Sequence, residues 1–149
     1  MQISLARAFK ERARLNQKII SALNLIKEEN SLVEGGVRSV DIRKKYQEFH
    51  DLSEKMIKLK QAISRANAGI EDKLVELMEV KHLLARVKDI PVMEGKQSED
   101  YSPMNGRVYS SEIKKGEITS ETETLQRRID VLQDEIDEFN ARTRIEFEL

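Results

Sequence analysis

The feature that most constrains this chain is an apolar seam between Val40 and Ile90, where apolar side chains recur every three or four residues. The first part of the seam consists of Ile42, Tyr46, Phe49, Leu52, Met56, Leu59, Ile63 and Ala66. The second part consists of Ile70, Leu74, Leu77, Leu84 and Val87. Because this spacing places side chains on one face of an α-helix, the seam predicts helices that pack on other helices.

The composition favours an all-α fold, an antiparallel helical bundle or coiled coil of about four helices. Of the 149 residues, 36% are charged and only 5% are aromatic. The length suits a single helical domain over residues 1–149. A narrow seam buries little area within one chain, so we expect other copies of the chain to cover part of it. The residues expected at this oligomer seam are Phe49, Leu52, Met56, Leu59 and Ile63.

Terminating residues divide the chain into four expected helices, which span about residues 3–31, 39–67, 70–90 and 120–140. Gly35 and Gly36 follow the first helix, and glycine tolerates the positive φ angles that stop a helix. Ser39 is the expected N-cap of the second helix. We expect Asn67-Ala68-Gly69 to close that helix with a left-handed residue. The alternative is one uninterrupted helix to Ile90, with Gly69 tolerated inside it.

The segment 91–119 contains both prolines of the chain and three of its six glycines, and it predicts a long loop or a small β-hairpin. Asn105-Gly106 is a hairpin turn signal. Ser120 followed by Glu123 is a capping box that predicts the start of the fourth helix. The alternation at residues 143–148 predicts a short terminal strand. Its expected pairing partner is either the hairpin or the same tail of a neighbouring subunit.

The chain offers little that indicates catalysis or cofactor binding. It has no Cys, no G-x-S-x-G motif and no glycine-rich phosphate loop, so we predict no catalytic residue, no cofactor and no enzymatic activity. Glu79 and His82 are candidate metal ligands, because the spacing of three places both on one helix face. A di-metal bundle needs a second such pair, and the other histidine, His50, has Gln47 at that position. His50 is also spaced to pair with Glu54.

The net charge of −1 gives no general attraction for nucleic acid or for an anionic membrane. Asp51 and Glu54 dilute the basic stretch on the second helix, and no exposed aromatic residue accompanies it, so we interpret it as a solvated face. This stretch consists of Lys55, Lys58, Lys60 and Arg65. The basic first half of the chain is expected to pack beside the acidic last helix. No apolar run approaches the roughly 20 residues that span a bilayer, and the start lacks a signal-peptide core, so we expect a cytoplasmic protein.

Three stretches resemble a family of small bacterial helical proteins, some of which carry the label septicolysin. Leu5–Ala13 is similar to the opening helix of that family, and Ala62–Asn67 is similar to its I-N-x-T-N helix end, with Ser64 and Ala66 in place of Asn and Thr. Residues 137–147 are similar to its closing helix and short extended tail. The resemblance implies a helical, oligomeric protein, and the label implies cytolysis, but no functional residue is carried over.

The sequence therefore predicts a non-enzymatic oligomeric helical-bundle protein with a structural or protein-interaction role. The alternatives are a septicolysin-like cytolysin, from the resemblance, and a metal-binding bundle, from Glu79 and His82. The predicted partner is the chain itself, through helix seams and through pairing of the terminal strand.

Overall fold

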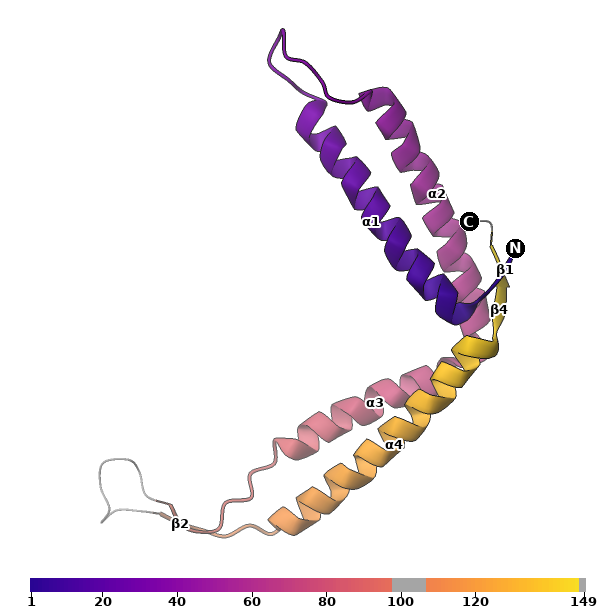
Figure 1. Cartoon of the computed structure of the whole chain (residues 1–149). Coiled ribbons are helices and arrows are strands. Elements are labelled where there is room, and N and C mark those ends of the chain that lie inside the picture. The colour runs from indigo at the N-terminus through magenta and orange to yellow at the C-terminus, as the bar shows by residue number, and fades with distance from the viewer. Residues whose placement is uncertain (98–106, 148–149) are drawn as a thin grey trace. The chain divides into compact units, whose positions relative to one another are not determined.

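The computed structural model describes residues 1–97 and 107–147. Over these residues the fold is helical with two short antiparallel strand pairs, which confirms the predicted fold class (Figure 1). The elements in chain order are β1 (Gln2–Ser4), α1 (Leu5–Glu29), α2 (Ile42–Asn67), α3 (Glu71–Lys88), β2 (Gly95–Gln97), β3 (Arg107–Tyr109), α4 (Lys115–Arg142) and β4 (Arg144–Glu146).

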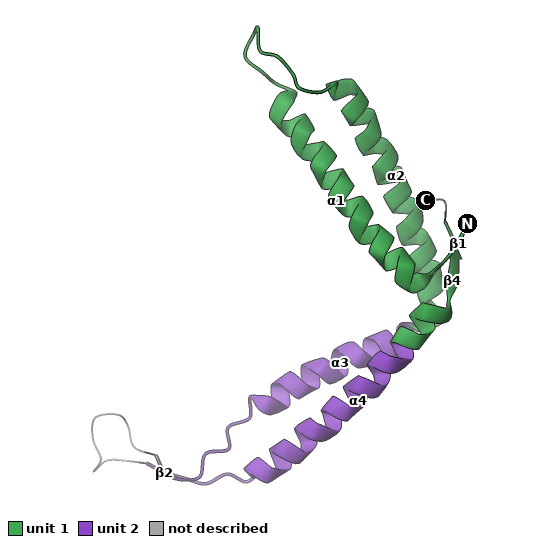
Figure 2. Cartoon of the chain, in the orientation of Figure 1, with its two compact units in different colours: residues 1–70, 137–149 green, residues 71–136 purple. Residues whose placement is uncertain are grey.

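The chain divides into two compact units rather than one (Figure 2). The first unit contains Met1–Ile70 and Asp137–Leu149, and the second contains Glu71–Ile136. The first unit is built on α1 and α2, which lie side by side, and the second on α3 and α4 (Figure 1). The two basic helices therefore pack on each other, whereas the sequence had suggested that they pack beside the acidic last helix.

The first helix begins two residues later than expected, because Gln2–Ser4 forms a strand. Ser4 is the N-cap, and its hydroxyl accepts a hydrogen bond of 3.2 Å from the backbone N–H of Arg7. This bond satisfies one of the four N–H groups that have no partner within a helix at its N-terminus. Because β1 runs directly into α1, the capped helix also fixes the position of Gln2–Ser4.

The N-cap of α2 is Asp41, not Ser39 as the sequence suggested. The Asp41 carboxylate accepts a 3.1 Å hydrogen bond from the backbone N–H of Lys44. Ser39 is engaged elsewhere, since its hydroxyl and its backbone N–H both donate to the Glu29 carboxylate. Arg38 donates to the carbonyl oxygens of Glu29 and Asn30 at the end of α1. These bonds fasten the loop between the helices to the end of α1.

The break between α2 and α3 is confirmed, but its geometry differs from the expected one. No residue of the Asn67–Gly69 turn has a positive φ angle, and Ala68 is right-handed with φ −53°. The turn closes through a 2.9 Å hydrogen bond from the Ile70 N–H to the Asn67 carbonyl. A Cβ at Gly69 would lie 3.4 Å from the Phe139 ring, which is ordinary van der Waals contact, so neither the φ angle nor the space at this position requires glycine.

The capping-box prediction at Ser120 is wrong, because α4 already begins at Lys115. Ser120 lies inside the helix, where its carbonyl accepts a hydrogen bond from the Thr124 hydroxyl. The cap is instead made by the Glu117 carboxylate, which accepts a 2.8 Å hydrogen bond from the Lys114 N–H. This is the reciprocal half of a capping box, made by the third helical residue. Several acidic residues near the start compete for this role, and spacing alone does not select one.

The expected small hairpin is present as β2 and β3, which pair antiparallel from Gly95↔Tyr109 to Gln97↔Arg107. The Asn105-Gly106 turn lies outside the described residues. Three bonds hold the base of the hairpin: Lys114 Nζ to Glu94 at 2.7 Å, Ser111 N–H to Glu94 at 3.2 Å, and Ser111 Oγ to the Met93 carbonyl at 2.8 Å. The hydrogen bond from Lys114 lowers the pKa of Glu94. These bonds thus hold the two ends of the 91–119 segment together, close to the end of α3 and the start of α4.

The predicted pairing of the terminal strand with the hairpin is wrong and its pairing with a neighbouring subunit stays a prediction, but the strand itself is confirmed as β4. It pairs antiparallel with β1, with Ile3 opposite Ile145. Backbone bonds from Leu5 N–H to the Thr143 carbonyl and from Phe147 N–H to the Met1 carbonyl extend this pairing at both ends. The sequence reading missed this because it assigned Ile3 to the first helix.

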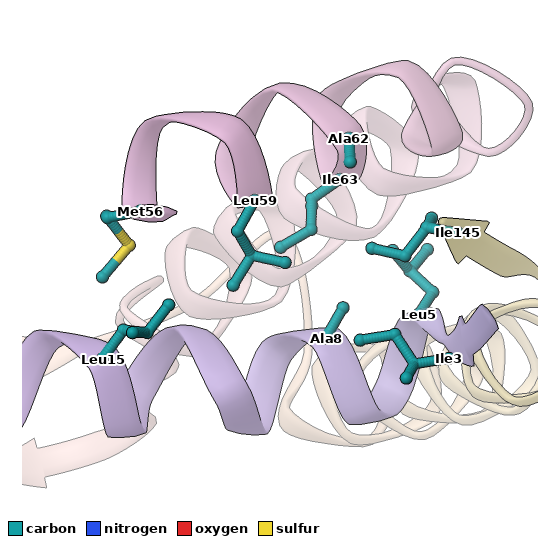
Figure 3. Close-up of a cluster of buried hydrophobic side chains, with 9 residues drawn as sticks. All are labelled: Ile3, Leu5, Ala8, Leu15, Met56, Leu59, Ala62, Ile63 and Ile145. Carbon is teal, nitrogen blue, oxygen red and sulfur yellow. The ribbon is translucent and has the colours of Figure 1, made fainter. Parts of the chain in front are cut away.

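The core of the first unit lies where α1, α2 and the β1–β4 pair meet (Figure 3). Figure 3 shows side chains of both helices pointing into the space between them. Leu5 and Leu59 are fully buried there. The buried cluster consists of Ile3, Leu5, Ala8, Leu15, Met56, Leu59, Ala62, Ile63 and Ile145. The two-stranded pair therefore covers one end of the helix interface with apolar side chains.

We predict that Leu59→Asp unfolds the first unit. Leu59 is 0% exposed, and an unpaired charge at such a site costs several kcal/mol. The measurement is thermal unfolding followed by circular dichroism. The matched control is Ile57→Asp on the same helix, because Ile57 is 48% exposed and should change stability by about 0.5 kcal/mol or less. Equal stability of Leu59→Asp and the parent would show that this face is not buried.

We also predict that Ser39→Ala raises the pKa of Glu29 toward its ordinary value. The hydrogen bond from the Ser39 hydroxyl is the largest of several effects that lower this pKa. Because the folded pKa lies below the unfolded one, the bond stabilises the fold above the unfolded pKa, and this stabilisation disappears as pH falls through the folded pKa. A carbon NMR titration of the Glu29 carboxyl measures the change. Ser31→Ala, in the same loop, should leave that titration unchanged.

Candidate functional site

The predicted oligomer seam is covered largely within the chain itself. Met56, Leu59 and Ile63 are buried in the cluster between α1 and α2, and Phe49 and Leu52 are half-buried. The periodicity therefore identified a buried face correctly, but the helix that covers its centre is α1 of the same chain. A second copy of the chain therefore has no access to Leu59 within this helix pair.

In the second unit, α3 and α4 lie side by side and bury one apolar stripe on each helix (Figure 1). Ion pairs join the helices: Arg128 donates to Glu76 Oε1 at 2.5 and 3.0 Å, and Lys73 contacts Glu135. These pairs are half-exposed, so each contributes at most about 1 kcal/mol. The buried stripe consists of Leu77, Val80, Leu84, Leu125, Ile129, Leu132 and Ile136.

A second stripe lies on α3 outside the buried one. Val75, Met78, His82 and Ala85 follow one another at spacings of three, four and three, so they share one face of the helix. Val75 is 51% exposed and Met78 is 50% exposed, and Leu74 beside them is half-buried. We call these five residues the α3 outer face. These five residues are uncharged, but charged side chains border them: Glu71 lies four residues before Val75, and Glu79 Oε1 lies 3.8 Å from His82 Nδ1.

Sequence reasoning missed this face because the main seam dominates the apolar pattern of residues 70–90. The signal was nevertheless present in the spacing of Val75, Met78 and Ala85. Apolar residues on more than one side of a helix indicate more than one contact surface. The sequence does not show which of the two stripes of α3 packs on α4, so the tertiary structure was needed to tell the buried stripe from the exposed one.

The candidate metal ligands Glu79 and His82 lie together on α3 but do not form a complete site. His82 Nδ1 is 3.8 Å from Glu79 Oε1, and both side chains are more than half exposed. Across residues 1–97 and 107–147, no three His, Asp or Glu side chains gather in a geometry that holds a metal ion. His82 also belongs to the α3 outer face, where its ring is half-exposed.

His50 does not pair with Glu54, as its spacing had suggested. Its ring contacts Tyr46 edge-on, with centroids 4.6 Å apart, and also approaches Phe49 at 5.7 Å. The three rings form an aromatic cluster on the first two turns of α2. Aromatic edge contacts of this kind add about 1 kcal/mol, so the cluster is adequately explained as local stabilisation of the helix start.

The basic stretch of α2 has neighbours that the sequence did not reveal. Lys55, Lys58 and Arg65 line two adjoining hollows, whereas Lys60 does not. The aromatic ring of Phe147, which follows β4, lines both hollows. Because Phe147 is half-buried, it does not contradict the expectation that no exposed aromatic residue accompanies this stretch. Phe147 lies more than 80 residues away in the sequence, so spacing within α2 gave no signal for it.

No helix in the described part of the chain is long and apolar enough to cross a membrane. No protein-family model matches the sequence, and none of the curated proteins is similar to it. Among solved structures, the fold is similar to the crystal structure of a functionally unknown conserved protein from Corynebacterium diphtheriae. The TM-score is 0.75 at 18% sequence identity, over 98% of this chain and 100% of that one. The similarity shows that both chains share the fold.

We predict that protein purified without chelators holds far less than one equivalent of zinc. Zinc sites use three or four protein ligands, and Glu79 and His82 supply two. Elemental analysis measures the metal, and His82→Ala should leave the content unchanged. One equivalent of zinc that is lost in His82→Ala would contradict this prediction and support the metal-binding alternative.

Proposed function

We propose that this chain is a non-enzymatic protein-interaction protein that self-associates through the α3 outer face. The observation that carries the proposal is the exposure of Val75 and Met78, two large apolar side chains that share one face of α3. Contact surfaces between proteins are depleted of charge at their centres and enriched in methionine and aromatic residues. Exposed apolar side chains at helical spacing are therefore suited to a partner helix.

A second copy of the chain is the partner that we propose. Apolar side chains are complementary to copies of themselves, so two copies of the chain can place Val75 and Met78 face to face about a twofold axis. The net charge of −1 leaves little repulsion between copies. Two α3–α4 pairs would then form a four-helix arrangement, in which α3 is covered on both of its apolar sides.

The absence of Cys from the sequence and of any catalytic motif supports the non-enzymatic part of the proposal. The lack of Cys also fits a reducing compartment, so we propose a cytoplasmic location. The cytolysin activity implied by the sequence resemblance has no supporting observation among the described residues. It is therefore not the function that we propose.

We predict that the double variant Val75→Glu/Met78→Glu weakens self-association by more than about tenfold. Two carboxylates at the centre of an apolar contact repel their copies across the twofold axis and lose contacts that each contribute about 1 kcal/mol or more. Sedimentation velocity over micromolar concentrations measures the dissociation constant. Circular dichroism should show unchanged helicity, because both side chains are half-exposed in the single chain.

The matched control is Val33→Glu, in the loop between α1 and α2. Val33 is also an apolar residue and is 88% exposed, but it lies on no helix face. It should leave the dissociation constant unchanged. A parent protein that is monomeric at every concentration, or a double variant that associates as tightly as the parent, contradicts the proposal.

A further inference from the structure

Two adjoining hollows in the first unit concentrate positive charge. The smaller, of about 280 Å³, is lined by Arg7, Arg14 and Lys18 of α1 and by Lys55 of α2. The larger, of about 620 Å³, is lined by Lys55, Lys58 and Arg65 of α2. Lys55 and Phe147 belong to both, so the hollows are neighbours along the helix pair. We call them together the basic groove.

The positive charge of the groove is not neutralised by the surrounding described residues. Two acidic side chains, Glu11 and Glu146, line the hollows against six basic ones. Of the six, only Arg14 forms an ion pair, at 3.9 Å from Glu11. The other five pair with no acidic side chain that the structure describes. Several like charges around one hollow raise the local potential and favour an anion there.

Three apolar side chains line the smaller hollow beside the charged ones. Leu15 is buried, and Leu52 and Phe147 are half-buried, so each presents part of its side chain to the hollow. Ligand sites combine an apolar lining with a few placed polar groups that fix orientation. A hollow with both cationic and apolar lining residues thus suits a ligand that has both an anionic group and an apolar part.

The fold fixes the positions of these groups. Arg7, Arg14 and Lys18 are seven and four residues apart, so they lie on one face of α1. Lys58 and Arg65 are likewise seven apart on α2. The Phe147 backbone N–H donates a 3.0 Å hydrogen bond to the Met1 carbonyl, which places the ring beside both helices. The groove is therefore assembled by the packing of α1 on α2 and by the pairing of β1 with β4.

We propose that the basic groove binds a small organic phosphate, with the phosphate at the cationic side chains and the apolar part against Leu15, Leu52 and Phe147. Arginine and lysine form charge-assisted hydrogen bonds with phosphate oxygens. The apolar part is either an alkyl chain, as in a lipid phosphate, or a flat ring, as in a nucleotide. This site is distinct from the α3 outer face and does not depend on self-association.

The test is isothermal titration calorimetry of the full chain with three probes. Inorganic phosphate carries the anion alone, dodecyl phosphate adds an alkyl chain, and adenosine monophosphate adds a ring. At least one organic phosphate should bind at least about threefold more tightly than inorganic phosphate, because only it contacts the apolar lining residues. The organic probe that binds more tightly identifies the source of the ligand.

Single-residue variants test whether the phosphate binds in the basic groove. Lys55→Gln should weaken binding at least about tenfold, because Lys55 is common to both hollows and a hydrogen bond to a charged group is lost. Lys60→Gln is the matched control, since Lys60 is on the same helix but outside the groove, and it should leave binding unchanged. Phe147→Ala should weaken the organic phosphates but not inorganic phosphate. Lys18→Gln provides a second, independent loss from α1.

Three results would overturn the proposal. The first is that no probe binds at millimolar concentration. The second is that Lys55→Gln and Lys60→Gln weaken binding equally, which would show general attraction to the basic surface rather than a site. The third is that a single-stranded oligonucleotide binds more tightly than both organic phosphates and loses affinity in Lys55→Gln, which would make the groove a nucleic-acid surface instead. Unchanged circular dichroism of each variant confirms that it is folded.

Discussion

The burial of Leu5 and Leu59 between α1 and α2 is the contact on which the first unit depends. An amphipathic helix gains most of its stability from the apolar face that it buries, and each of these helices has the other as its cover. Leu5 is also the first residue of α1 and bonds through its N–H to the Thr143 carbonyl. The same residue therefore fixes both the helix pair and the position of the C-terminal segment.

The pairing of β1 with β4 has consequences beyond the burial of Ile3 and Ile145. Three-residue strands are too short to be stable alone, so this pair exists because its apolar side chains join the helix core. It also sets Phe147 beside the cationic residues of both helices. A contact that contributes to stability thus also helps to form the basic groove. The α3 outer face, by contrast, needs no tertiary contact beyond the α3–α4 pair.

The helices and the hairpin were predictable because their signals are local. These signals are the three-and-four spacing, the turn at Asn67–Gly69 and Pro91. Each depends on residues close in sequence, and the structure has helices and helix ends near the predicted places. Helix starts were less predictable, because several residues near each start can cap. Asp41 caps in place of Ser39, since the Ser39 hydroxyl bonds to Glu29. That bond spans ten residues, and no pattern within one helix reveals it.

The sequence by itself determined which residues form helices and which face of each helix is apolar, since backbone geometry and side-chain spacing are properties of neighbouring residues. Only the tertiary structure decided what covers each face. It placed α1 over Met56, Leu59 and Ile63, and it brought Phe147 to Lys55. The hydrophobic effect is non-directional. An apolar stripe in the sequence therefore shows that a helix face will be buried, but not which element will bury it. The choice of partner depends on contacts between residues far apart in the chain.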